Sequence, residues 1–325
     1  MLHTMRTRTI MPMLASVVVA AFLVVAPATG AGAATRASSG CGQDAAPGVT
    51  TRHITVGGAD REYLLSIPDD YDPSKPAPLL FDFHGLSSNM QEQSLYTRLD
   101  QQGGARGYVV ITPNGQGDVL RHWSLVPSAA RNPDVAFVQA MLRTTNRALC
   151  IDQRRVFSTG ISNGAMFSTL LACALPGRLA AIAPVAGINA TAVCGAGTPR
   201  VSVLAFHGTG DPIVPYQGGA YFSGSPVGRA LGVPEAKSVD DAAAAWAAFD
   251  GCGTPAAQSF VADDVQHVVW PDCPVTGAVE LYRVLGGGHT WPGAAAVGAD
   301  RLGPTTASID ATKLVLDFFD AHARR

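Results

Sequence analysis

The chain has 325 residues, a formal net charge of −2 and a 15% share of charged residues. No run of basic residues occurs in it, which argues against a nucleic-acid partner. The length suits a single α/β domain, because such folds often exceed about 250 residues without dividing.

The first 33 residues have the pattern of a secretory signal peptide. Arg6 and Arg8 make a basic start, Met13–Ala26 is a short apolar run, and Ala31-Gly32-Ala33 fits a cleavage site. The run is short for a bilayer span, so we expect a secreted protein with no membrane partner once the signal is removed. Loss of the two arginines would take the net charge from −2 to −4.

A flexible leader is expected over residues 34–48, which are rich in Ala, Ser, Gly and Pro, and one folded domain over 49–325. Strand-like and helix-like segments alternate in this domain. The expected strands are Arg61–Ile67, Leu79–His84, Tyr108–Thr112, Arg155–Thr159, Ala181–Val185, Val201–Phe206 and Glu280–Val284. The expected helices begin at Asn132-Pro133, after Gly164, at Ser238 and near Ala311. This alternation predicts an α/β fold with a mostly parallel central sheet and helices on both faces.

The segment Gly160-Ile161-Ser162-Asn163-Gly164 stands between a strand-like and a helix-like run. A Gly-x-Ser-x-Gly motif in that setting is typical of a nucleophile elbow, a tight turn that lifts a serine hydroxyl above a sheet. The glycines let backbone segments approach closely, and the helix start offers N–H groups to a developing oxyanion. The alternative is an ordinary turn serine.

An acid and a histidine follow this serine, each in a loop just after a predicted strand. Open α/β sheets carry their site residues at such strand ends. The chain order Ser162, Asp211, His289 is that of an α/β-hydrolase triad, and we expect these three residues to be catalytic. His84 and His207 also end strands, but their positions do not fit this order.

Structural roles are the alternatives for the predicted acid and base. Asp211 precedes Pro212, as turn residues often do, and His289 lies among glycines. Six other acids compete for the role of the triad acid, and they lie at a predicted helix start, near cysteines or in polar loops: Asp240, Asp241, Asp250, Asp263, Asp264 and Asp272.

The backbone N–H groups of Leu86 and Asn163 are the expected oxyanion hole. Phe83-His84-Gly85 ends a predicted strand, and its glycine lets the chain turn the next N–H toward the site. Trp291, two residues after the predicted base, is expected to wall the substrate pocket. Trp123 is expected to face the cleft. An ordinary glycine turn is the alternative at Gly85, and packing against the histidine loop is the alternative for Trp291.

Six cysteines in an exported chain indicate disulfides. Free buried thiols are the alternative, and no zinc site is expected because no Cys-x-x-Cys pair occurs. Position in the sequence favours pairs that bracket short segments, with the remaining two cysteines forming the third pair. The expected disulfides are Cys173–Cys194, Cys252–Cys273 and Cys41–Cys150.

Several segments together resemble secreted feruloyl esterases and polyhydroxybutyrate depolymerases, over about Cys41 to Phe319. The resemblance implies a lidless α/β-hydrolase fold, an ester substrate, the triad given above, a sequential disulfide pattern, and neither metal nor organic cofactor. The segments that carry it are Phe83-His84-Gly85, Cys150-Ile151-Asp152, Arg155–Gly164, Leu170-Leu171-Ala172-Cys173, His207–Tyr216 and Gly288-His289-Thr290-Trp291-Pro292.

Two departures from this family bear on the prediction. Asp82 stands where the family more often has an apolar strand residue, and a carboxylate there needs a partner or a raised pKa. The chain ends soon after its last predicted helix, whereas extracellular polyester depolymerases usually append a polymer-binding domain. We therefore favour feruloyl esters of plant polysaccharide, with polyester as the alternative substrate. Transfer of the acyl group to an alcohol, and a non-catalytic binding protein, are hypotheses from other classes.

Overall fold

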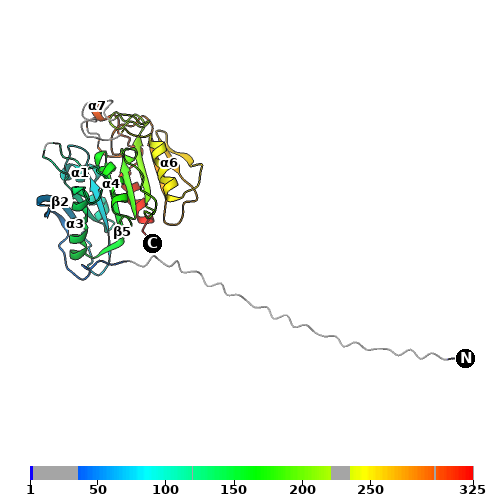
Figure 1. Ribbon diagram of the computed structural model, residues 1–325, viewed down its shortest axis with the longest axis horizontal. Coiled ribbons are helices and arrows are strands. Elements are labelled where there is room, and N and C mark those ends of the chain that lie inside the picture. Colours follow the sequence, from blue (N-terminus) through cyan, green and yellow to red (C-terminus); the bar gives the residue numbers. More distant parts are fainter. Residues whose placement is uncertain (3–35, 119, 221–234, 296–297, 325) are drawn as a thin grey trace. The chain divides into compact units, whose positions relative to one another are not determined.

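A computed structural model describes residues 1–2, 36–118, 120–220, 235–295 and 298–324 (Figure 1). Apart from its first two residues, the expected signal peptide lies outside the described residues. Within them, ten strands form one sheet in the order β1-β2-β4-β3-β5-β6-β7-β10-β9-β8. The strands are β1 (Gly48–Val56), β2 (Ala59–Ile67), β3 (Ala77–Phe83), β4 (Val109–Pro113), β5 (Ile151–Ile161), β6 (Ala181–Val185), β7 (Ser202–Gly208), β8 (Ala257–Ala262), β9 (Val265–Val269) and β10 (Val279–Val284).

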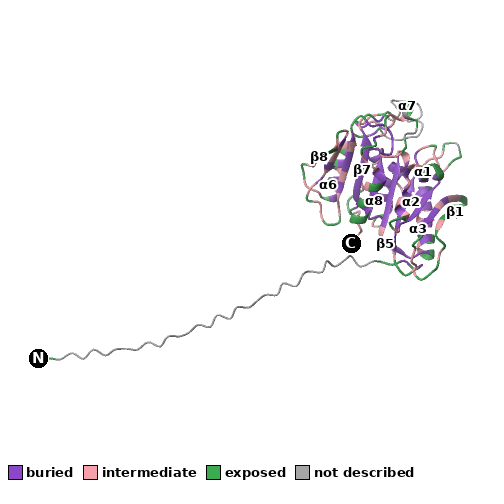
Figure 2. Cartoon of the chain, turned by 180° about the vertical axis from the view of Figure 1, so that it is seen from behind, coloured by how far each residue is buried: buried purple, intermediate pink, exposed green. Residues whose placement is uncertain are grey.

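The six central strands, from β4 to β10 in the sheet order, are parallel, and the strands at both edges are antiparallel. The helices are α1 (Met90–Thr97), α2 (Leu99–Gly104), α3 (Pro133–Ala148), α4 (Asn163–Ala174), the 3-10 turn η1 (Ile188–Ala190), α6 (Val239–Asp250), α7 (Ala299–Leu302) and α8 (Ala311–Ala321). Helices α3, α4 and α6 cover one face, while α1, α2 and α8 cover the other. The central strands are buried between these layers (Figure 2). The predicted α/β architecture is confirmed.

Two helix starts follow the capping signals in the sequence. The Asn132 side chain accepts hydrogen bonds from the backbone N–H groups at the start of α3, and Pro133 is the first residue of that helix. The Ser238 side chain accepts from the N–H of Asp241 at the start of α6. The sequence patterns did not predict β1, α1, α2, η1, β8, β9 or α7. No helix among the described residues combines the length and the apolar character needed to cross a bilayer.

Asp82 lies fully buried near the end of β3, and its hydrogen-bond partners lie on α1. Its two carboxylate oxygens accept hydrogen bonds from Gln93 Nε2 and Thr97 Oγ1, each at 2.6 Å. Burial raises the pKa of Asp82 to about 7, against the effect of these two donors and with a contribution from the charge of Asp100. The carboxyl group therefore ties α1 to the sheet.

The Asp82→Asn variant is expected to have a flatter dependence of stability on pH. Between the ordinary carboxyl pKa of 3.8 and about 7, folded Asp82 binds more proton than unfolded Asp82, so stability falls as the pH rises. The lost contribution should be of the order of 4 kcal/mol. Asp250, whose pKa burial also raises to about 7, adds a slope of the same sign to both proteins. Thermal unfolding from pH 4 to pH 7 measures this, and parallel profiles for variant and wild type would contradict it.

The segment before β1 is held against the domain. The backbone N–H of Ser38 donates to the carbonyl of Ile151 at 2.9 Å, and Cys41 forms a disulfide with Cys150. The expectation of a flexible leader over 34–48 is therefore wrong from residue 36 onward. Composition misled here, because the small residues of this segment fit closely beside α3 and β5 and are fixed by long-range bonds.

Two further disulfides join Cys173 to Cys194 and Cys252 to Cys273. With the first disulfide they are the three pairs that the sequence favours. The Cys173–Cys194 disulfide closes the segment that runs from the end of α4 through β6 and η1. Closing loops of this kind typically stabilises a fold by about 2–4 kcal/mol each.

Candidate active site

Ser162 lies on a strained turn between β5 and α4. Its backbone has φ 56° and ψ −123°, which a non-glycine residue adopts at a cost of about 1–3 kcal/mol. A Cβ at Gly164 would collide with the carbonyl oxygens of Phe83 and His84, and one at Gly160 would collide with that of Phe83. Both glycines of the motif are thus required, because β3 passes directly against the turn.

Asp211 is fixed by its own loop just after β7. Its Oδ1 accepts the backbone N–H groups of Ile213 at 2.8 Å and Val214 at 2.9 Å. Its Oδ2 accepts a hydrogen bond from His289 Nδ1 at 2.7 Å. Asp211 is 7% exposed and His289 is 6% exposed. The structure therefore brings together the acid and the histidine that the chain order predicts.

A second imidazole, that of His207, also contacts Asp211. Its Nε2 lies 2.9 Å from the carbonyl oxygen of Val214 and 3.3 Å from Asp211 Oδ2, so the Nε2–H points at both. Chain order excluded His207 as the base, and sequence reasoning gave it no other role. The signal for it was available, since a histidine at the end of a strand and four residues before the acid can reach that acid.

The surroundings of Asp211 favour its charged form. Burial alone would raise the pKa of this carboxyl, but the charge of His289 and the hydrogen bonds from His207 and His289 outweigh burial and hold the pKa well below its ordinary range. Asp211 is consequently a carboxylate at any pH at which an ester hydrolase works, and it can stabilise an imidazolium at His289.

The loop that carries His289 follows β10 and packs against the end of α7. The His289 N–H donates to the carbonyl of Leu302 at 2.6 Å, and the Gly288 N–H donates to that of Pro304 at 2.8 Å. A Cβ at Gly288 would collide with the backbone of Leu302 and Gly303. The glycine before the histidine therefore allows the close approach that fixes the imidazole.

Ser162, His289 and Leu86 line one cavity of about 520 Å³. Its walls are mainly apolar, and α1 supplies much of one side. Sequence reasoning missed α1 and with it this wall. The capping signal was present, because the Asn89 side chain accepts the N–H of Glu92 three residues later. The remaining lining residues are Gly85, Ser88, Glu92, Gln93, Leu95, Tyr96, Ile161, Ala295 and Leu302.

Trp291 does not wall the pocket, and that prediction is wrong. It is 1% exposed, and its indole N–H donates to Thr312 Oγ1 at 3.0 Å. Its backbone N–H donates to the hydroxyl of Tyr96 at 3.0 Å. Trp291 thus joins the histidine loop to α8 and α1, because the loop turns its side chain into the core rather than toward the cavity.

Trp123 does not face the cleft either. It is also 1% exposed, and its ring stacks on Phe167 at a centroid distance of 5.1 Å and meets the edge of Phe83 at 5.0 Å. Its indole N–H donates to the carbonyl of His84 at 2.9 Å. The structure shows both tryptophans packed beneath the site.

Comparisons with known proteins agree with this picture, although no family model matches the chain. Feruloyl esterase C of Emericella nidulans is 32% identical over 241 residues, which cover 71% of this chain and 83% of that protein. Probable feruloyl esterase C of Aspergillus oryzae is 30% identical over 280 residues, which cover 80% and 93%. In structure, an acetyl xylan esterase from Aspergillus awamori aligns with a TM-score of 0.59 at 13% identity, covering 84% of this chain and 99% of that chain.

The chain is an α/β-hydrolase, as shown by the sheet order, the turn at Ser162 and the loops after β7 and β10. Its similarity to known esterases shows that it is a serine carboxylic-ester hydrolase. The identity to the two curated esterases extends over most of both chains. The chain therefore belongs to the feruloyl esterase family.

Proposed function

We propose that this protein is a secreted enzyme that hydrolyses feruloyl esters of plant polysaccharide through Ser162, Asp211 and His289. The observation that carries the proposal is the hydrogen bond of 2.7 Å between His289 and the buried Asp211, together with the place of Ser162 and His289 in one cavity. The names of the curated relatives supply the substrate class.

The chemistry follows from the roles of these groups. Ser162 Oγ attacks the ester carbonyl, and His289 takes the serine proton and passes it to the leaving alcohol. Asp211 holds the imidazole in the required tautomer and stabilises the imidazolium. Water activated by His289 then releases the acid from the acyl-enzyme. The N–H groups of Leu86 and Asn163 are proposed to bind the oxyanion, since Leu86 lines the cavity and Asn163 begins α4 beside the serine.

The cavity suits an aromatic acyl group. It is large enough for a hydroxycinnamoyl unit, and the side chains of Leu86, Ile161 and Leu302 give it apolar walls. Export is supported by the signal-like start of the chain and by the three disulfides, which persist in oxidising surroundings.

A substrate panel on the purified protein tests the proposed substrate class. We expect methyl ferulate to be cleaved with a higher kcat/KM than p-nitrophenyl butyrate, and little 3-hydroxybutyrate to be released from a polyhydroxybutyrate suspension. The Ser162→Ala variant measures the background in each assay. Rapid release from the polymer with methyl ferulate untouched would replace the feruloyl proposal with the polyester alternative.

A further inference from the structure

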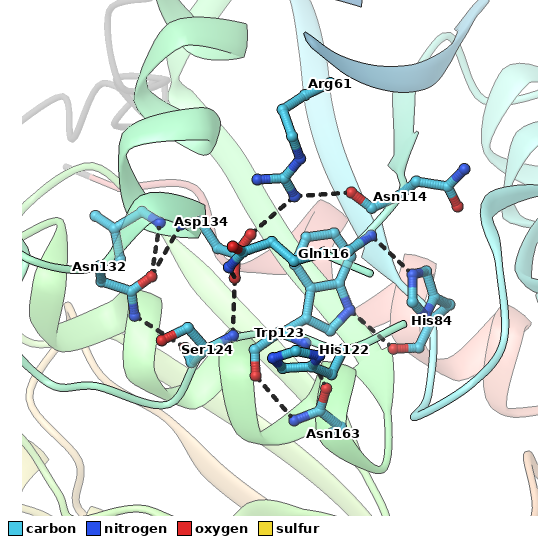
Figure 3. Close-up of polar contacts among 12 residues, drawn as sticks. Arg61, His84, Asn114, Gln116, His122, Trp123, Ser124, Asn132, Asp134 and Asn163 are labelled. Atoms are coloured by element: carbon cyan, nitrogen blue, oxygen red, sulfur yellow. Dashed lines mark hydrogen bonds and ion pairs between the residues drawn. The ribbon is translucent and has the colours of Figure 1, made fainter. Parts of the chain in front are cut away.

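One buried tryptophan is bonded to both segments that supply the proposed oxyanion donors. The indole N–H of Trp123 donates to the carbonyl of His84, two residues before Leu86, at 2.9 Å. The backbone N–H of Trp123 donates to Asn163 Oδ1 at 2.7 Å, and Asn163 Nδ2 donates back to the Trp123 carbonyl at 3.2 Å. Figure 3 shows Trp123 between His84 and Asn163.

We propose that Trp123 is a positioning residue that sets the distance between the two oxyanion donors. The N–H of Leu86 belongs to the turn after β3, and the N–H of Asn163 belongs to the start of α4. These segments are far apart in the sequence, and the three hydrogen bonds of Trp123 connect them through its side chain and its backbone. The inference rests on the proposed function, because it concerns the same oxyanion.

The loop that carries Trp123 is itself anchored to the fold. The fully buried Asp134, in the first turn of α3, accepts the N–H of Ser124 at 2.8 Å and Gln116 Nε2 at 2.9 Å. Its other oxygen pairs with Arg61 of β2 at 2.8 Å. Trp123 is thus held by residues outside the site, so it can fix the positions of both segments that carry the proposed oxyanion donors (Figure 3).

The turn after β3 is fixed by a second set of bonds around His84. The Nε2 of His84 accepts the N–H of Gly115 at 2.9 Å, so Nδ1 carries the proton and donates to the carbonyl of Gly85 at 2.7 Å. Burial lowers the pKa of His84 to about 4, partly against the hydrogen bond to Gly85. The imidazole therefore stays neutral near pH 7, and this arrangement of donors and acceptors is kept there.

Preorganisation of this kind has a kinetic signature. Donors aimed at the oxyanion act in the transition state, so displacing one of them lowers kcat and leaves KM nearly unchanged. A tryptophan that merely fills the core would affect stability and leave the kinetics of the folded enzyme alone. The two roles are separable by comparing two Trp→Phe variants that lose the same volume, of which only one loses a hydrogen bond of its indole N–H.

The test compares Trp123→Phe with Trp246→Phe. Trp246 of α6 is also fully buried, but its indole N–H has no hydrogen-bond partner among the described residues. Both variants lose similar volume, and only the first loses a hydrogen bond. For methyl ferulate we expect Trp123→Phe to lower kcat by about 10–100-fold with KM within about twofold, somewhat less than the loss of a whole oxyanion donor. Trp246→Phe should keep the wild-type kcat.

A second variant tests the contact between Trp123 and Asn163. Asn163→Ala keeps the proposed backbone donor and removes the acceptor for the Trp123 N–H, so it should also lower kcat at nearly constant KM. It decides the matter if Trp123→Phe fails to fold. In the double variant the fold-loss of kcat should be smaller than the product of the two single losses, because both substitutions change the distance between the two oxyanion donors.

Binding of a boronic acid, which forms a tetrahedral adduct with an active-site serine, should weaken in parallel with kcat, while binding of the product ferulate should not change. Wild-type kcat in folded Trp123→Phe or in Asn163→Ala would overturn the proposal. So would an equal loss in Trp246→Phe, or a rise in KM at constant kcat. Failure of the proposed function is recognised separately, by activity that survives in Ser162→Ala.

Discussion

Replacing Ser162 by alanine is expected to lower kcat for methyl ferulate by about a millionfold while the protein stays folded. In the proposed mechanism this side chain forms the acyl-enzyme, and Ser162 lies on a strained turn that lines the same cavity as His289. Alanine at this position keeps the strained backbone with a smaller side chain, so the loss is chemical. Steady-state kinetics and the circular dichroism spectrum of the variant measure the two parts of this prediction.

A matched control is Ser259→Ala, an exposed serine on the edge strand β8. It makes the same chemical change away from the cavity and should keep the full rate. Activity of Ser162→Ala at even a tenth of the wild-type rate would assign the nucleophile to another residue.

The second large effect is expected for Asp211→Asn, which should lower kcat by about ten-thousandfold. The amide can still accept the N–H groups of Ile213 and Val214, so the loop should keep its shape. It cannot stabilise an imidazolium, and its NH₂ group favours the wrong tautomer of His289. Because the pKa of Asp211 lies well below its ordinary range, the loss should be similar from pH 6 to pH 8.

Asp241→Asn is the control for this prediction. Asp241 is one of the rival acids in the sequence, and it lies exposed in the first turn of α6. The variant should retain the wild-type rate on methyl ferulate. An Asp211→Asn enzyme with nearly full activity, or a large loss of activity in Asp241→Asn, would assign the role of the triad acid to another residue.

The parts of the site that the sequence predicts are those set by local backbone chemistry. The turn at Ser162 needs two glycines, the loop of His289 needs another, and each lies at the end of an apolar strand that is easily recognised. Chain order then selected Asp211, which the hydrogen bond to His289 supports.

The missed strands β1 and β8 are largely exposed, and the missed helix α1 buries mainly polar residues. Helix α1 buries Gln93, Ser94 and Thr97, and two of these bond to Asp82. Apolar periodicity cannot detect such a helix, because its inner face is hydrophilic. The same partners explain the carboxylate on β3 that the sequence left unexplained.

The misplaced tryptophans show the limit of reasoning from neighbours in the sequence. Trp291 follows His289 by two residues, yet its side chain bonds to Thr312 of α8 beneath the site. Trp123 packs between β3 and α4 for a similar reason. Which way a loop side chain points depends on the helices that cover it, and these become known only with the fold.

The most direct test of the account is to identify the residue that becomes acylated or phosphorylated. The enzyme is treated with diisopropyl fluorophosphate, reduced and alkylated, digested with trypsin and analysed by mass spectrometry, with methyl ferulate hydrolysis followed in parallel. The account predicts one label per chain, on Ser162 in the peptide 156–178, with activity lost in proportion to labelling and no label in Ser162→Ala. A label on another residue, or full activity after complete labelling of Ser162, would contradict it.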